Sequence, residues 1–180
     1  YLSSDYQMDR TRDSWSFTPR LRWQHGLGDL KSETVAGVDY YSGEVEAPQS
    51  SKFMGVSFDW TQGSKQDSTG VYLQNITEFG YGWSSLLGVR YQSVDQSTSY
   101  NGTQQNQNEY SRNAWDAGLN YAGQGWRAYG KVGTTFRFPN TDELLFAQPG
   151  GLRPQHGTSA ELGGSATLGP LTSRASVYYM

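Results

Sequence analysis

The sequence contains no cysteine, only two histidines and no long run of apolar residues. Without cysteine, neither a disulfide framework nor a cysteine-based zinc or redox site can form. His25 and His156 lie far apart and in no ligand-spaced motif, so we expect no metal site. A membrane-spanning helix is excluded as well, because no stretch approaches roughly 18 consecutive apolar residues.

Charge is also sparse. Asp, Glu, Lys and Arg make up 17% of the chain, and the net charge is −3 with no basic cluster, which offers no footprint for nucleic acid. No serine lies in a nucleophile-elbow context, so we expect no catalytic residue, no enzyme activity and no cofactor. The chain opens at Tyr1 without a signal peptide, which indicates either a removed leader or a piece of a longer protein.

The dominant feature that is present is a two-residue alternation of apolar and polar side chains. From Trp126 to Phe138, Trp, Ala, Val and Phe alternate with Arg, Tyr, Lys and Thr. This period predicts a β-strand with one apolar face, and Pro139 ends it because proline has no N–H to donate. Similar alternation recurs along the chain and predicts eight or nine antiparallel strands. Pro19 lies within one of them and predicts a local interruption of pairing.

The connections between these strands are unequal. Short turns are predicted at 26–29, 80–82, 123–125 and 168–170, and long polar loops at 42–66, 96–111 and 139–156. A short strand or hairpin is expected inside 42–66, whereas 96–111 is too polar to build a core and is expected to be a mobile loop. Alternating short turns and long loops are typical of transmembrane β-barrels of the outer membrane, with the short turns in the periplasm.

Aromatic and charged residues agree with this interpretation. Aromatic residues gather toward two levels, as expected at the two membrane interfaces. One level adjoins the short turns (Trp23, Phe79, Tyr81, Trp83, Tyr121, Trp126) and the other the loops (Trp15, Tyr40, Tyr91, Trp115, Phe138, Tyr179). Charges of both signs fall on the polar face, where we expect mostly cross-strand ion pairs (Arg20, Arg22, Lys31, Glu33, Asp39, Glu78, Arg90, Asp116, Arg127, Lys131, Arg137, Glu161).

The residues around Pro139 resemble the barrel signature of TonB-dependent outer-membrane receptors. The segment 135–144, TFRFPNTDEL, is followed by Leu152-Arg-Pro154 and by Ala160-Glu-Leu-Gly163, similar to the family's "FRxP…EL" and "LxPE…ELG" segments. Gln155 and His156 stand where the family usually has glutamate. The motif residues are expected to be structural (Phe136, Arg137, Pro139, Glu143, Leu144, Leu152, Pro154, Glu161).

The resemblance implies that residues 1–180 form part of a larger, 22-stranded type of barrel, without the plug domain and the remaining strands. It implies a Gram-negative outer-membrane receptor for active uptake of a metal chelate such as a siderophore, or of a vitamin or haem. A TonB-type coupling protein would act through the missing plug, and the lipid bilayer would surround the barrel. Candidate substrate contacts are aromatic or cationic loop residues (Trp60, Tyr100, Tyr110, Arg153).

Three other interpretations remain open at this point. The chain could be a complete small eight-stranded outer-membrane barrel with an adhesin or structural role, since about eight strands can close around a filled interior. It could belong to a fatty-acid or nutrient channel. Alternating strands and glycine-rich turns also occur in soluble sandwiches, although these need no rhythm of short and long connections.

Overall fold

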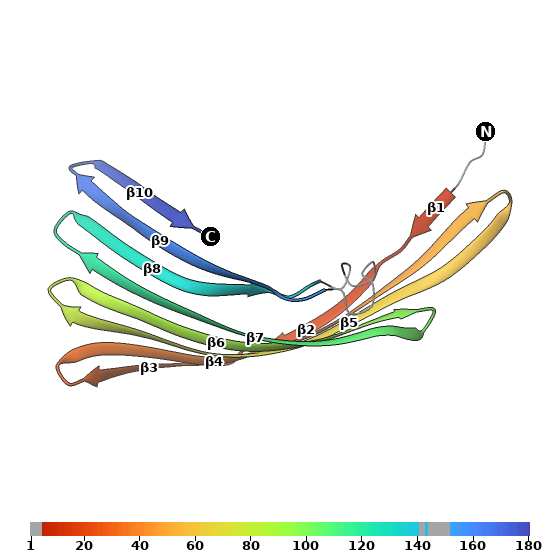
Figure 1. The fold of residues 1–180 in the computed structure, drawn as a ribbon, viewed down its shortest axis with the longest axis horizontal. Helices are drawn as coiled ribbons and strands as arrows, with labels where there is room; N and C mark the ends of the chain where they lie inside the picture. The colour runs from red at the N-terminus through yellow and green to blue at the C-terminus, as the bar shows by residue number, and fades with distance from the viewer. Residues whose placement is uncertain (1–4, 141–142, 144–151) are drawn as a thin grey trace.

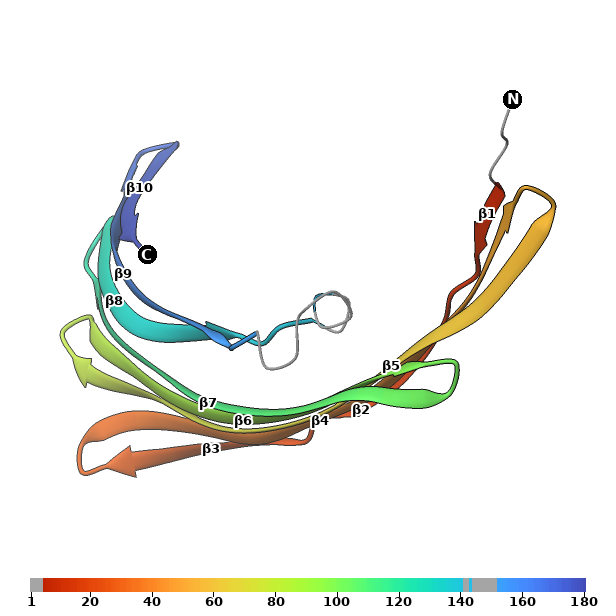
Figure 2. The same ribbon diagram turned by 45° about the vertical axis from the view of Figure 1, so that its right-hand side comes forward.

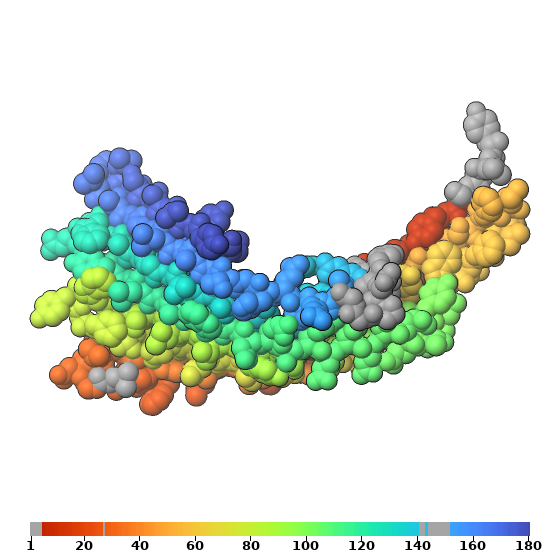
Figure 3. Space-filling model, in the orientation of Figure 1, coloured from red at the N-terminus to blue at the C-terminus, as the bar shows by residue number. Residues whose placement is uncertain are grey.

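The computed structural model describes residues 5–140, 143 and 152–180. They form one antiparallel sheet, curved along its length in the ribbon views (Figures 1 and 2) and in the space-filling view (Figure 3). Its strands are β1 (Asp5–Met8), β2 (Thr11–Phe17), β3 (Arg20–Leu27), β4 (Leu30–Phe53), β5 (Val56–Gly80), β6 (Trp83–Tyr100), β7 (Thr103–Ala122), β8 (Trp126–Arg137), β9 (Gln155–Leu168) and β10 (Leu171–Tyr179).

The ten strands occupy eight positions in the sheet. β1, β2 and β3 all pair with β4, so they are three segments of one edge strand, and the order is then β4-β5-β6-β7-β8-β9-β10. The break between β2 and β3 falls at Pro19, as predicted, because proline cannot donate to the ladder. The Pro19 carbonyl still accepts a hydrogen bond from the Val38 N–H at 3.1 Å. The predicted all-β antiparallel sheet of eight or nine strands is thus confirmed.

All four predicted short turns lie together at one end of the sheet, at the left in Figure 1. We call it the short-turn end. Glycine is required most clearly at Gly82, whose φ is +84°, and an added Cβ there would lie 2.2 Å from the carbonyl oxygen of Ala122. That carbonyl belongs to β7, which continues the sheet beyond β6, so the turn packs directly against its neighbour.

The opposite end, which we call the hairpin end, corrects the sequence analysis. The hairpin expected inside 42–66 is present, but it is the end of two long strands, because β4 and β5 pair from Lys31–Glu78 to Phe53–Val56. Residues 96–111 are not a mobile loop, because β6 and β7 pair out to Tyr100 and Thr103. The tips are two-residue turns, Met54-Gly55 and Asn101-Gly102, with positive φ at both residues, as in type I′ hairpins. Backbone ladders need no apolar side chains, so polar composition did not exclude strands here.

The sheet has two faces of opposite character. Registered partners such as Leu87 and Ala117 share the outer face, whereas Arg90 and Ala114 share the inner face. Buried apolar side chains are few among the described residues: Ala47, Val94 and Pro139. The apolar residues of the outer face remain exposed instead (Leu21, Trp23, Val71, Leu73, Leu87, Val89, Leu119, Val132, Leu162, Val177). A sheet of this kind has no core of its own, so its apolar face requires an apolar surrounding.

Aromatic contacts mark two levels of the outer face. Near the short-turn end, the Tyr121 ring centroid lies 4.8 Å from that of Trp83 and 4.6 Å from that of Trp126. Toward the hairpin end, Trp15 and Tyr40 lie 4.8 Å apart. On β6 the two levels are marked by Trp83 and Tyr91. The path along the strand between them is roughly 26 Å, at about 3.3 Å per residue. At the usual strand tilt of about 35–45°, that path spans roughly 20 Å along the membrane normal, which approaches the apolar band of about 25 Å on transmembrane barrels.

Candidate functional site

The inner face is polar and internally paired in the half near the short turns. Arg90 Nη1 lies 2.7 Å from Asp39 Oδ2, and its guanidinium carbon lies 5.7 Å from the centre of the Tyr72 ring. Arg22 pairs with Glu33 at 3.3 Å, and Lys131 lies 3.9 Å from Asp116. Cross-strand ion pairs of the predicted kind are therefore present at these three places.

Residues 138–140, which we call the inward segment, follow β8 and lie against the inner face. β8 stays paired with β7 only to Gly133, and beyond it the chain turns inward. The Phe138 ring stacks at 6.3 Å on Tyr110, an inner-face residue of β7. The sequence analysis placed Phe138 on the outer belt. That assignment is wrong, because strict alternation cannot show where β8 leaves its neighbour.

Gln96 anchors this segment to the wall of the sheet. Its side chain is 2% exposed, and its Nε2 donates to the Pro139 carbonyl and to Gln66 Oε1, both at 2.8 Å. Its Oε1 is buried without a hydrogen-bond partner. Both donor hydrogens are used, so the amide orientation is fixed by two acceptors. Burial of Val94 and Thr98 beside it, at 2% and 1% exposure, reflects the same close packing.

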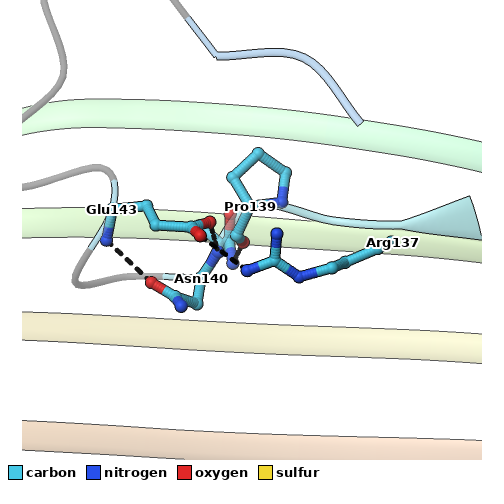
Figure 4. A network of polar contacts seen from close by, with 5 residues as sticks. Arg137, Pro139, Asn140 and Glu143 are labelled. Carbon is cyan, nitrogen blue, oxygen red and sulfur yellow. Dashed lines mark hydrogen bonds and ion pairs between the residues drawn. The ribbon is translucent and has the colours of Figure 1, made fainter. Parts of the chain in front are cut away.

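Arg137, Asn140 and Glu143 form a second network at the start of the segment (Figure 4). The Glu143 N–H donates to Asn140 Oδ1 at 2.7 Å, and the Asn140 N–H donates to Glu143 Oε2 at 2.9 Å. This reciprocal pair is a capping box, and the backbone of Glu143 is helical. Arg137 Nη2 lies 2.6 Å from Glu143 Oε1, so the box is tied to the end of β8.

Two ionisable groups of this region have shifted pKa values. The Arg137 guanidinium, followed by the Asn140 N–H, lowers the pKa of the Glu143 carboxyl below its usual 4.5, because both favour the charged form. Burial raises the pKa of the Tyr110 hydroxyl above 10.0. Both groups therefore keep their ordinary neutral-pH state, a carboxylate and a protonated phenol.

The remaining motif residues hold strands together or lie outside the described chain. Glu161 accepts a hydrogen bond from the Tyr129 hydroxyl, and the Leu152 carbonyl accepts one from the Tyr110 hydroxyl at 3.4 Å. Pro154 directly precedes β9, and Phe136 is a half-buried residue of β8. Leu144 lies outside the described residues.

The register places two of the four candidate substrate contacts near each other, because Tyr100 pairs with Gln62, two positions from Trp60 on β5. Trp60 lies on the inner face of the β4–β5 hairpin with its ring 6.3 Å from Tyr6, and Tyr100 lies at the tip of the β6–β7 hairpin, partly exposed. Arg153 is exposed ahead of β9. Tyr110 is bound to Phe138 and the Leu152 carbonyl, which makes it part of the packing of the inward segment.

The sequence analysis missed a cavity on the inner face at the hairpin end. It has a volume of about 260 Å³, and its lining includes Arg10, Arg12, Tyr41, Gln66 and Asn140. Arg12 Nη2 donates to the Tyr41 hydroxyl at 2.9 Å. The sequence did contain a signal for it, the charged stretch Arg10-Thr-Arg-Asp13. In a strand, alternation places Arg10 and Arg12 on one face and Asp13 on the other.

The fold and this wall define the class of the protein. Within residues 5–140, 143 and 152–180, no helix is long and apolar enough to cross a membrane. In the same described residues no group of three His, Cys, Asp or Glu side chains could hold a metal ion. A continuous antiparallel sheet with an exposed apolar face, two aromatic levels and a charged inner face is a section of transmembrane β-barrel wall.

The chain belongs to the TonB-dependent receptor β-barrel family. The family model described as "TonB dependent receptor-like, beta-barrel" matches residues 1–180, and proteins of this family are located in the outer membrane of Gram-negative bacteria. Because outer-membrane barrels have short periplasmic turns and longer extracellular connections, we expect the short-turn end in the periplasm and the hairpin end outside the cell. No curated protein matches the sequence.

Solved structures share the fold at low sequence identity. The unliganded ferric citrate transporter FecA is 18% identical with a TM-score of 0.87, over 97% of this chain and 28% of that one. The ferric yersiniabactin uptake receptor FyuA from Yersinia pestis is 14% identical with a TM-score of 0.74, over 98% and 29%. The copper transporter OprC is 16% identical with a TM-score of 0.73, over 95% and 30%. The chain thus spans less than a third of the length of these relatives.

Proposed function

We propose that this chain is part of the barrel of a receptor that actively imports a metal chelate, such as a siderophore, across the outer membrane. The observation that carries the proposal is the pair of long hairpins, β4–β5 and β6–β7, which extend the polar inner wall far beyond the aromatic levels. β4 and β5 have 24 and 25 residues, whereas about 9–11 residues suffice to span a bilayer. A vitamin or haem belongs to the same class of cargo.

The structural relatives support a metal-containing cargo without identifying it. FecA and FyuA are named for iron chelates, and OprC is named for copper. We place the energy source in a TonB-type coupling protein that acts through a plug domain outside residues 1–180. Support comes from family membership and from the chain's short span relative to its neighbours. Trp60, Tyr100 and Arg153 are proposed as loop contacts for the cargo, with Tyr110 supporting them from below.

The open shape of the sheet argues against the complete small barrel with an adhesin or structural role. In the described residues β10 pairs only with β9, and the β1–β3 edge pairs only with β4. Both edges therefore carry unpaired backbone groups, which a membrane cannot satisfy. A closed barrel requires further strands between these edges.

Uptake of radiolabelled iron chelates by intact cells tests the proposal. Cells that express the full-length receptor should accumulate at least one chelate, and deletion of the receptor gene should abolish that uptake. Deletion of the TonB-type protein should abolish it equally. Uptake that persists without the coupling protein would indicate a passive nutrient channel instead.

A further inference from the structure

Charges at the hairpin end are segregated between the two faces. The acidic residues of these strands share the outer face by register and alternation (Asp5, Asp13, Glu44, Glu46, Asp59, Asp67, Asp95, Glu109). Lys52 and Lys65 accompany them on the outer face, and Lys65 Nζ lies 3.5 Å from Asp67 Oδ2. Asp9 likewise lines a hollow together with the outer-face residues Ser50 and Asp59. Alternation alone does not produce this result, because it fixes which positions are polar and leaves the sign of their charge open.

The inner face of the same strands is cationic and rich in amides. Arg12 pairs in register with Val45, and Arg112 pairs in register with Gln92, so both arginines lie on the inner face. Arg10 lines the inner cavity beside Arg12. Around them lie the side-chain amides of the inner wall (Gln49, Gln62, Gln66, Gln92, Gln96, Asn106, Asn108). Among the described residues above the Arg90–Asp39 pair, the inner-face carboxylate is Glu143, and Arg137 neutralises it.

The Arg12 guanidinium at the cavity is held in place. Tyr41 accepts a hydrogen bond from Arg12, and Arg10 and Arg12 each make at least one further contact. The cavity that they line with Gln66 and Asn140 measures about 260 Å³, which is the scale of one arm of a chelate. A guanidinium presents several N–H donors in a planar fork that suits carboxylate and catecholate oxygens.

We propose that this inner wall selects an anionic metal chelate, one whose carboxylate or catecholate oxygens face Arg10 and Arg12. The inference rests on the proposed function and makes it more specific. An anion that enters between the hairpins meets positive charge and amide donors on the inside, while the acids on the outside repel it from the outer surface. Such segregation also raises the rate of capture at low ionic strength.

The test uses the full-length receptor that contains these 180 residues, purified in detergent. Quenching of tryptophan fluorescence gives affinities for two probes, an anionic ferric tricatecholate and a neutral ferric trihydroxamate. Arg12→Gln should weaken binding of the anionic probe by about tenfold or more and leave the neutral probe nearly unchanged, because one charge-assisted contact is lost. Arg12→Lys keeps the charge and should retain most of the affinity. Lys65→Gln, which removes a positive charge from the outer face, is the matched control.

Each outcome decides between the two proposals. Tighter binding of the anionic probe, with loss in Arg12→Gln and none in Lys65→Gln, supports anion selection. Equal or tighter binding of the neutral probe overturns it while leaving chelate uptake intact, as does an equal effect of Arg12→Gln on both probes or an equal effect of Lys65→Gln. Failure of both probes to bind the wild-type receptor overturns the proposed function and the inference with it.

Discussion

Leu86 and Leu87 are identical neighbours on β6 that face opposite sides of the wall, and they provide a matched test of the facing assignment. Leu87 is 56% exposed on the outer face, paired with Asn75 and Ala117 and midway between Trp83 and Tyr91. Leu86 is half-buried on the inner face, paired with Ile76 and Gly118. We compare Leu87→Arg with Leu86→Arg in the full-length receptor.

The expected costs follow from depth in the bilayer. Arginine near the midplane of a transmembrane barrel costs about 2–4 kcal/mol, and near an interface about 0–1 kcal/mol. Leu87→Arg should fall in the first range. Leu119→Arg should cost less than Leu87→Arg, since Leu119 lies two residues from Tyr121 of the periplasmic belt. Leu86→Arg should cost about 1 kcal/mol, because it gives up apolar contact but its guanidinium reaches the polar interior.

Reversible unfolding of the receptor in lipid vesicles by denaturant measures these differences. A gap of about 2 kcal/mol between Leu87→Arg and Leu86→Arg is a change of roughly thirtyfold in the folding equilibrium. Equal costs, or a larger cost for Leu86→Arg, would refute the assignment of lipid and lumen to the two faces.

Three further predictions follow from the turns and the inward segment. An epitope tag at Gly102 should be detected by antibody on intact cells and one at Gln124 should not; the reverse result would invert the topology. Gly82→Ala should destabilise the receptor by about 1–3 kcal/mol more than Gly80→Ala, since both have positive φ but only the first meets a backbone oxygen at 2.2 Å; equal losses by denaturant unfolding would contradict that contact. The lowered pKa of Glu143 means that its stabilising effect is complete above pH 4.5 and is lost as the pH falls through the lowered value. Hydrogen-exchange protection of its own amide should follow that titration, and a Glu143→Gln receptor with the same pH profile would show that another group is responsible.

The strands and the short turns could be predicted because their signals are local. Alternation around Trp126 fixes a strand and its apolar face within a few residues, and Pro19 and Pro139 end pairing through their own chemistry. The capping box from Asn140 to Glu143 is local in the same sense. The hairpin tips also carried a local signal, the Asn101-Gly102 pair, which the polar composition of the surrounding residues concealed.

The inward segment could not be predicted, because its contacts join residues distant in sequence. Gln96 and the Pro139 carbonyl are 43 positions apart, and nothing in either stretch specifies the other. The same holds for the cavity, where Arg12 and Tyr41 meet across 29 positions. The separation of acidic and basic residues between the two faces could not be predicted either. It depends on the register, which places the acidic residues of β2, β4, β5 and β7 on the outer face.

Site-directed spin labelling along β6 tests the central claim most directly, because these 180 residues contain no native cysteine. Single cysteines from position 84 to position 91 of the full-length receptor in lipid bilayers would each carry one label. The account predicts that accessibility to dissolved oxygen peaks at positions 85, 87, 89 and 91, which share the outer face, and falls at 84, 86, 88 and 90. Uniform accessibility along the strand, or maxima at the even positions, would contradict a barrel wall with this face toward lipid.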